Sequence, residues 1–260
     1  MKKSLITLIL VMLLCSFAAA YASDPIEVNV LAAASLTDSL NKIIENYSKS
    51  NPDVKIIPVY ESSGTLRKQI EEGADADIFL SANEKHMNTL ADENLIDKDS
   101  RIDLLGNDLT LIASKETAEK LASITDFKSI LTDESVKTIA IGEPTDVPAG
   151  QYAKESLDNL KIWDTVSSKL VYGKNVKAVL TYVDSGNADL GFVYKTDAML
   201  LKSGKILMNV PADSYTAVNY PAALLKNAKQ PESAKKFFEY LGSDDAKAVF
   251  EKYGFTFLKK

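Results

Sequence analysis

The sequence has very little cysteine or histidine and no excess of basic charge. Cys15 is the only cysteine and His86 the only histidine among 260 residues. One thiol excludes a disulfide within the chain, and one imidazole excludes a zinc site built on clustered histidines. The 30 Lys and Arg residues stand against 36 Asp and Glu, for a net charge of −6. This balance argues against nucleic acid or an anionic membrane surface as a partner.

The first residues have the pattern of an export signal. Met1-Lys2-Lys3 precedes an apolar run over residues 5–14, and Ala20-Tyr21-Ala22 has the small-x-small spacing of a cleavage site. We expect residues 1–22 to be a signal peptide that is cleaved after Ala22. The mature chain would then have 28 basic and 36 acidic residues and no cysteine.

The expected location is therefore outside the cytoplasm, in a periplasm or at an extracytoplasmic cell surface. The apolar run is too short to span a bilayer comfortably, which disfavours a retained membrane anchor. A lipid anchor on Cys15 is also disfavoured, because Leu14 precedes it where lipoprotein signals normally carry a small residue.

Short β-rich runs alternate with helical patterns along the rest of the chain. This alternation predicts an α/β fold with mixed, mostly parallel sheets flanked by helices. No internal repeat or Pro/Gly-rich linker interrupts it. Strands are expected near residues 26–32, 54–60, 77–81, 109–113, 137–141, 169–172, 190–194 and 206–209. Helices are expected at 36–49, 64–72, 84–92, 116–123, 150–160, 176–185 and 195–202, then at 231–241 and 243–252 after an extended segment over 215–225.

Four of the expected helices begin directly after a strand-like segment, near residues 35, 63, 149 and 176. The N-terminus of a helix has unpaired N–H groups and the positive end of the helix dipole, so it suits an anion. In open α/β sheets, ligands bind beyond the carboxyl ends of the strands. Serine is a common N-cap everywhere, so Ser35 and Ser63 indicate a site only together with the other helix starts.

Six motifs along the chain, taken in order and spacing, resemble the periplasmic molybdate-binding proteins of molybdate ABC transporters. The resemblance covers essentially the whole mature chain. It implies a two-lobed periplasmic-binding-protein fold of type II, with lobe 1 formed by residues 24–106 and 222–260 and lobe 2 by residues 107–221. The motifs are Ala32-Ala33-Ala34-Ser35-Leu36-Thr37, Gly73-Ala74-Asp75-Ala76-Asp77-Ile78-Phe79, Val147-Pro148-Ala149-Gly150, Tyr152-Ala153-Lys154-Glu155, Leu190-Gly191-Phe192-Val193-Tyr194 with Thr196-Asp197-Ala198, and Lys252-Tyr253-Gly254-Phe255.

The resemblance also implies an oxyanion site between the lobes. It assigns hydroxyl and amide contacts to Ser35 and Ser63, amide contacts to Ala149 and Val176, and a hydroxyl contact to Tyr194. The ligand would be molybdate or tungstate, with no cofactor and no direct metal ligand. The partner would be the permease of an ABC importer, and the protein would be a monomer without enzymatic activity.

The sequence departs from the family pattern at two places. Glu61-Ser62-Ser63-Gly64 stands where relatives often have a run of serines, so Ser62 is a rival to Ser63 for the direct contact. His86 stands where relatives often have tryptophan, and we expect it on a surface-facing helix without a chemical role.

Three alternative functions remain open on the sequence. A carrier of a ferric complex usually clusters tyrosines, whereas Tyr194 has no evident partner. A carrier of organic acids usually supplies an arginine, and Arg67 is the only arginine near the expected cleft. A secreted serine hydrolase would need His86 as its base, and no Gly-x-Ser-x-Gly motif surrounds Ser35 or Ser63.

Overall fold

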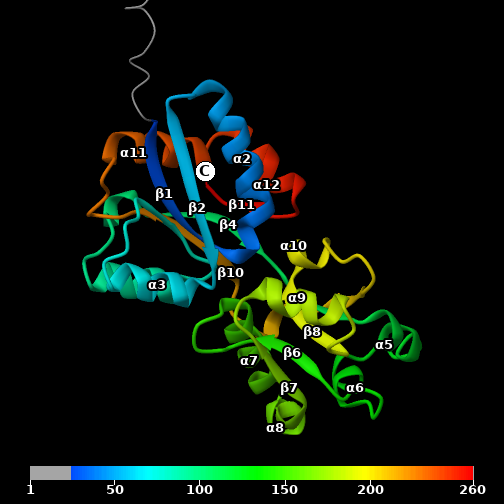
Figure 1. Ribbon diagram of the computed structural model, residues 1–260. Helices are drawn as coiled ribbons and strands as arrows, with labels where there is room; N and C mark the ends of the chain where they lie inside the picture. The colour runs from blue at the N-terminus through cyan, green and yellow to red at the C-terminus, as the bar shows by residue number, and fades with distance from the viewer. Residues whose placement is uncertain (1–24, 260) are drawn as a thin grey trace, which may run out of the picture.

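The computed structural model describes residues 25–259, so the expected signal peptide and its cleavage after Ala22 lie outside the described residues. The chain forms two sheets, each flanked by helices (Figure 1). The six-stranded sheet has the order β11-β4-β10-β3-β1-β2 and the five-stranded sheet the order β7-β6-β8-β5-β9. We call the units built on these sheets lobe 1 and lobe 2. Between residues 25 and 259, no helix is long and apolar enough to cross a membrane.

Lobe 1 combines a parallel half and an antiparallel half. Its parallel strands are β1 (Ile26–Ala33), β2 (Val54–Glu61) and β3 (Ile78–Leu80), and its antiparallel strands are β4 (Ile102–Asn107), β10 (Val218–Leu224) and β11 (Thr256–Phe257). Its helical elements are η1 (Ala34–Leu36), α2 (Thr37–Ser50), α3 (Ser63–Glu71), α4 (Glu84–Asp92), η2 (Lys98–Ser100), α11 (Pro231–Leu241) and α12 (Asp244–Lys252).

The last two helices return to lobe 1 and pack beside its first helix (Figure 1). Tyr47 of α2 lies edge-on to Phe237 of α11, with ring centroids 5.0 Å apart. Both side chains are buried. The end of the chain therefore completes the core around β1 and β2, which lead into the expected helix starts at Ser35 and Ser63.

Lobe 2 has the same plan. Its parallel strands are β6 (Ile139–Gly142), β7 (Leu170–Gly173) and β8 (Leu190–Tyr194), and β5 (Leu109–Ala113) and β9 (Lys205–Asn209) pair antiparallel. Its helical elements are α5 (Lys115–Lys120), α6 (Phe127–Thr132), α7 (Pro148–Asn159), α8 (Trp163–Val166), η3 (Ser167–Lys169), α9 (Val176–Asp184), α10 (Lys195–Ala198) and η4 (Ala212–Ser214).

The chain passes between the lobes twice, once from β4 to β5 and once from β9 to β10 (Figure 1). The outgoing and returning segments run in opposite directions, so β4 pairs antiparallel with β10, and β5 pairs antiparallel with β9. The expected α/β fold with mixed sheets is confirmed, with more antiparallel pairing than the alternation of strands and helices predicts. One residue, Asp108, separates β4 from β5, and the three-residue η4 lies between β9 and β10.

Candidate functional site

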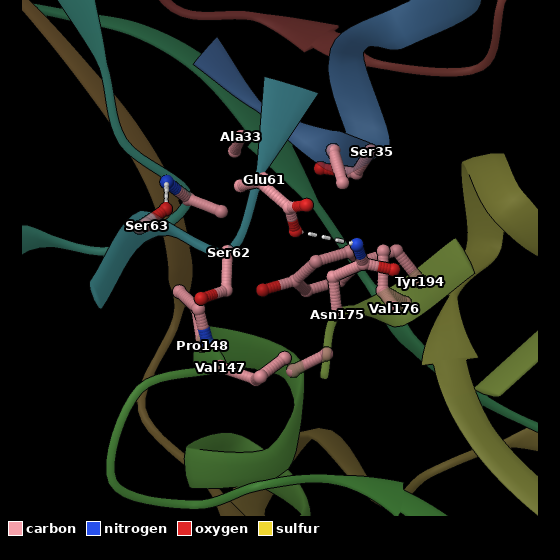
Figure 2. Close-up of a pocket in the computed structure, with 13 residues that line it drawn as sticks. Ala33, Ser35, Glu61, Ser62, Ser63, Val147, Pro148, Asn175, Val176 and Tyr194 are labelled. Atoms are coloured by element: carbon pink, nitrogen blue, oxygen red, sulfur yellow. Dashed lines mark hydrogen bonds between the residues drawn. The ribbon is translucent and has the colours of Figure 1, made fainter. Parts of the chain in front are cut away.

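A small cavity lies between the lobes, and about 200 Å³ is free of protein atoms when its opening to solvent is included. All five positions predicted from the sequence line it, and they come from four strand-to-helix junctions and the end of β8 (Figure 2). The structure therefore brings these positions together, while their role as ligand contacts stays a prediction. The lining residues are Ala33, Ala34, Ser35, Glu61, Ser62, Ser63, Ala82, Val147, Pro148, Ala149, Asn175, Val176 and Tyr194.

Ser35 is held by a hydrogen-bonded chain that the sequence does not reveal. Its Oγ lies 2.9 Å from the hydroxyl oxygen of Tyr220 on β10, and Asn107 Nδ2 donates to the same tyrosine oxygen at 3.3 Å. Because Asn107 donates a hydrogen bond to the Tyr220 hydroxyl oxygen, the Tyr220 O–H group is free to donate a hydrogen bond to Ser35 Oγ. The Ser35 proton then remains available to a ligand. Burial raises the pKa of Tyr220 well above its ordinary value, which keeps it a donor.

Ser63 is prepared in the same way by a backbone group. Its Oγ accepts a hydrogen bond of 2.9 Å from the Ala82 amide, so its proton is also free to be donated (Figure 2). Ser62 has a different task, because its Oγ caps α3 by accepting from the Thr65 amide at 3.2 Å. Both serines line the cavity, and Ser62 Oγ also lies 2.8 Å from Thr65 Oγ1, where either hydroxyl can donate.

Two backbone amides on lobe 2 begin helices at the cavity wall. Val176 is the first residue of α9, and Asn175 caps that helix by accepting from the Ala178 amide at 3.0 Å. Ala149 follows Pro148, which has no N–H, so the Ala149 amide is the first donor of α7. Amides in a first helical turn have no partner within the helix. The side chains of Val176 and Ala149 are buried and serve packing.

Tyr194 carries the most informative group of the site. Its side chain is 1% exposed, and its hydroxyl is buried without a hydrogen-bond partner anywhere in residues 25–259. Burial raises the pKa of this phenol well above its ordinary value, so the hydroxyl keeps its proton. A buried, unpaired polar group costs about 1–3 kcal/mol. The hydroxyl points into the cavity (Figure 2), where an acceptor would satisfy it.

His86 is not surface-facing, and the expectation from the sequence was wrong. The residue is 2% exposed, and its Nε2 lies 3.3 Å from Nε2 of Gln151 on lobe 2. Burial, assisted by the positive charges of Arg67, Lys85 and Lys68 and opposed by Asp146, lowers its pKa from 6.5 to about 4. The first turn of α4 packs against α7 across the lobe interface, which periodicity within α4 does not show.

The lobes are closed on one another around the cavity. The Gly64 amide of lobe 1 donates to the Asp146 carbonyl of lobe 2 at 2.9 Å, and Lys68 forms an ion pair with Asp146 at 2.7 Å. On another side, Lys177 of α9 pairs with Asp38 of α2 at 2.6 Å. Arg67 forms its ion pair with Glu71 of its own helix and does not line the cavity.

Comparison with known proteins identifies the family. The model of the family described as "Bacterial extracellular solute-binding protein" matches residues 28–256. The chain belongs to this family. The two-lobed fold of this solute-binding protein is that of type II periplasmic binding proteins. Proteins of this family are binding components of transport systems and not enzymes, so the hydrolase hypothesis fails.

Three relatives show how far the similarity extends. The putative ABC transporter substrate-binding lipoprotein YvgL of Bacillus subtilis is 44% identical over 89% of this chain and 86% of its own. The molybdate-binding protein ModA of Haemophilus influenzae is 41% identical, covering 88% of this chain and 90% of that one. The solved substrate-binding domain of a putative molybdenum ABC transporter from Clostridium difficile is 41% identical with a TM-score of 0.68, covering 90% of this chain and 99% of that one.

Proposed function

We propose that this solute-binding protein captures molybdate in the cavity between its lobes and delivers it to the permease of an ABC importer. The observation that carries the proposal is the buried Tyr194 hydroxyl, a hydrogen-bond donor that points into the cavity and has no partner within residues 25–259. The similarity to molybdate-binding proteins over most of the chain supports the identity of the ligand. Tungstate, an anion of nearly the same size, is proposed as a second ligand.

The proposed contacts are the hydroxyls and amides of Ser35 and Ser63, the amides of Ala149 and Val176, and the Tyr194 hydroxyl. Such groups donate hydrogen bonds, which suits a fully deprotonated tetrahedral dianion. Phosphate keeps a proton near neutral pH that needs an acceptor. Sulfate has no such proton, but its shorter bonds would leave donors fixed for molybdate out of reach. Two or three unpaired donors at about 1–3 kcal/mol each give roughly a hundred-fold discrimination or more.

We propose that residues 24–106 and 222–260 form lobe 1, residues 107–221 form lobe 2, and residues 1–22 are an export signal. The mature protein would act as a monomer in the periplasm or at the extracytoplasmic cell surface. A ferric complex is disfavoured because the cavity offers one tyrosine and no imidazole, and an organic acid is disfavoured because no arginine lines it.

Molybdate will raise the melting temperature of the processed protein strongly, whereas the same concentration of sulfate will barely change it. A ligand present at a thousand times its Kd stabilises the native state by about 4 kcal/mol. Differential scanning calorimetry with molybdate, tungstate, sulfate and phosphate measures this directly. Equal shifts with molybdate and sulfate would remove the size argument and the proposed ligand with it.

Tyr194→Phe will weaken molybdate binding roughly ten-fold or more without destabilising the ligand-free protein. The variant removes one donor, worth about 1–3 kcal/mol in a buried site, and leaves the packing of the ring against Tyr220 unchanged. Isothermal titration calorimetry gives the affinity, and urea unfolding gives the stability. Tyr215→Phe is the matched control, because Tyr215 does not line the cavity. Its hydroxyl accepts a 3.0 Å hydrogen bond from the Leu109 amide. Unchanged affinity in Tyr194→Phe would contradict a hydroxyl contact.

A further inference from the structure

Glu61 is an unexpected residue in the wall of a site for a dianion. It is the last residue of β2 and stands next to Ser62 and Ser63, and its side chain lines the cavity. A bare carboxylate here would repel an anion and offer it acceptors instead of donors. A glutamate at this position is therefore expected to have another role in the site.

Both carboxylate oxygens of Glu61 are occupied by groups from lobe 2. Oε2 accepts from Asn175 Nδ2 at 2.9 Å, and Oε1 accepts from Lys174 Nζ at 3.0 Å (Figure 2 shows the first bond). Burial raises the pKa of the Glu61 carboxyl, but the hydrogen bonds from Asn175 and Lys174 outweigh burial, so its pKa lies below the ordinary value. The carboxyl is therefore ionised and directed at lobe 2.

The two partners differ in what they contribute. The Lys174 side chain is 75% exposed, and solvent-exposed ion pairs contribute little. Asn175 is only 9% exposed, and a charge-assisted hydrogen bond to a buried amide is stronger. The Glu61–Asn175 bond is thus the main link between this carboxylate and lobe 2.

Asn175 is fixed at both ends of its amide group. Its Oδ1 accepts from the Ala178 amide and caps α9, and its Nδ2 donates to Glu61. The next residue is Val176, whose amide is one of the proposed ligand donors. Glu61 therefore orients, from the opposite lobe, the residue that sets the start of α9.

We propose that Glu61 is a positioning residue that makes oxyanion binding depend on lobe closure, an inference that rests on the proposed function. When the lobes separate, Glu61 loses both partners and leaves an unpaired negative charge beside Ser62 and Ser63. Lobe 1 alone then holds a dianion poorly. Closure gives the carboxylate its hydrogen-bond partners and fixes the Val176 amide in the same movement, so the anion is held firmly only in the closed state.

The test compares molybdate affinity and dissociation rate in five variants and the wild type. Glu61→Gln keeps an oxygen that accepts from Asn175 and loses the charge. Glu61→Ala loses both. Asn175→Ser keeps a capping oxygen but cannot reach Glu61, and the double variant Glu61→Ala with Asn175→Ser completes a double-mutant cycle. Lys174→Ala is the control for the exposed ion pair.

We expect Glu61→Ala and Asn175→Ser each to bind molybdate about ten- to a hundred-fold more weakly, mainly through faster dissociation, because one charge-assisted hydrogen bond is worth ~1.5–3 kcal/mol. The double variant should bind no more weakly than either single variant, since both remove the same bond. Lys174→Ala should stay within about three-fold of the wild type. Glu61→Gln should bind with an affinity between those of the wild type and Glu61→Ala, because it keeps the hydrogen bond to Asn175 without its charge assistance. Melting temperatures without ligand should be unchanged by Glu61→Ala, because the bond forms only on closure.

Two results would overturn the inference. If Glu61 were only part of the wall, Glu61→Ala and Glu61→Gln would both bind molybdate as tightly as the wild type or more tightly, since each removes a negative charge beside a dianion. Strict additivity in the double variant would show that Glu61 and Asn175 act separately. Failure of the wild type itself to bind molybdate would refute the proposed function instead, which separates the two.

Discussion

Replacing Gly64 by alanine will weaken molybdate binding by about a hundred-fold or more while leaving the ligand-free protein at least as stable as the wild type. Gly64 lies in the first turn of α3 on lobe 1 and meets lobe 2 directly. A Cβ atom at this position would lie 2.6 Å from both Cα and the carbonyl oxygen of Asp146. Backbone atoms cannot step aside as a flexible side chain can, so the lobes must stay apart.

The size of the effect follows from what partial closure removes. Lobe 2 supplies the proposed Ala149, Val176 and Tyr194 donors, and losing two or three of them costs about 1–3 kcal/mol each. The fold of lobe 1 gains instead, because alanine in a helix is favoured over glycine by roughly 0.5–1 kcal/mol. The variant therefore separates closure from folding.

Calorimetric titration with molybdate, together with the melting temperature with and without it, measures both effects. Gly106→Ala on β4 is the matched control, since a Cβ there would make ordinary contacts of 3.5 Å or more with Thr256 and Leu258. We expect that variant to bind as the wild type does. If Gly64→Ala closed and bound normally, the described contact between α3 and Asp146 would not be part of the ligand-bound state.

The sequence predicts the positions of this site better than the interactions that arrange it. Helix starts after strands are local patterns, and those at Ser35, Ser63 and Val176 appear in the structure within a residue or two of where we expected them. Parallel strands bring such helix starts to one edge of a sheet. The cavity follows from applying this rule to both lobes.

Contacts between residues far apart in the chain cannot be predicted from such local patterns. Tyr220 meets Ser35 across 185 positions, and Glu61 meets Asn175 across 114. Neither pair leaves a local signal, because a tyrosine in an extended segment and a glutamate at a strand end are ordinary surface residues in sequence terms. His86 was misplaced for the same reason.

The short elements were missed for a different reason. α6 has six residues and α8 has four, too few for a 3.6-residue period to stand out. β4 lies at a crossing between the lobes, where its pattern merges with that of β5 after a single intervening residue. Their absence from the prediction did not displace the site, because none of them lines the cavity.

His86 will make the closed protein sensitive to acid. Its pKa in the folded state is lowered to about 4, below the ordinary 6.5, so the unfolded chain binds the proton more tightly. The stability gained from keeping this imidazole neutral is complete above pH 6.5 and is lost progressively as the pH falls from 6.5 to about 4. At pH 5 the loss is ~2 kcal/mol, because each pH unit below 6.5 costs about 1.4 kcal/mol. Protonation would also place an N–H on Nε2, where Gln151 now donates.

The sole histidine makes this measurable in tag-free protein. With molybdate saturating, so that the lobes remain closed, the imidazole proton resonance should not titrate between pH 7.5 and pH 5, as a pKa of about 4 requires. In urea unfolding, the wild type should lose ~2 kcal/mol relative to His86→Gln between pH 7.5 and pH 5. Buried Asp197 acts in the opposite direction. Burial raises its pKa to about 6, so the folded state binds a proton more tightly than the unfolded chain, and this contribution to stability increases as the pH falls. It is present in both proteins, so its effect cancels in the comparison. A histidine midpoint near 6.5, or parallel pH profiles of the two proteins, would mean that His86 is open to water in the closed state and that the contact with Gln151 does not link α4 to lobe 2.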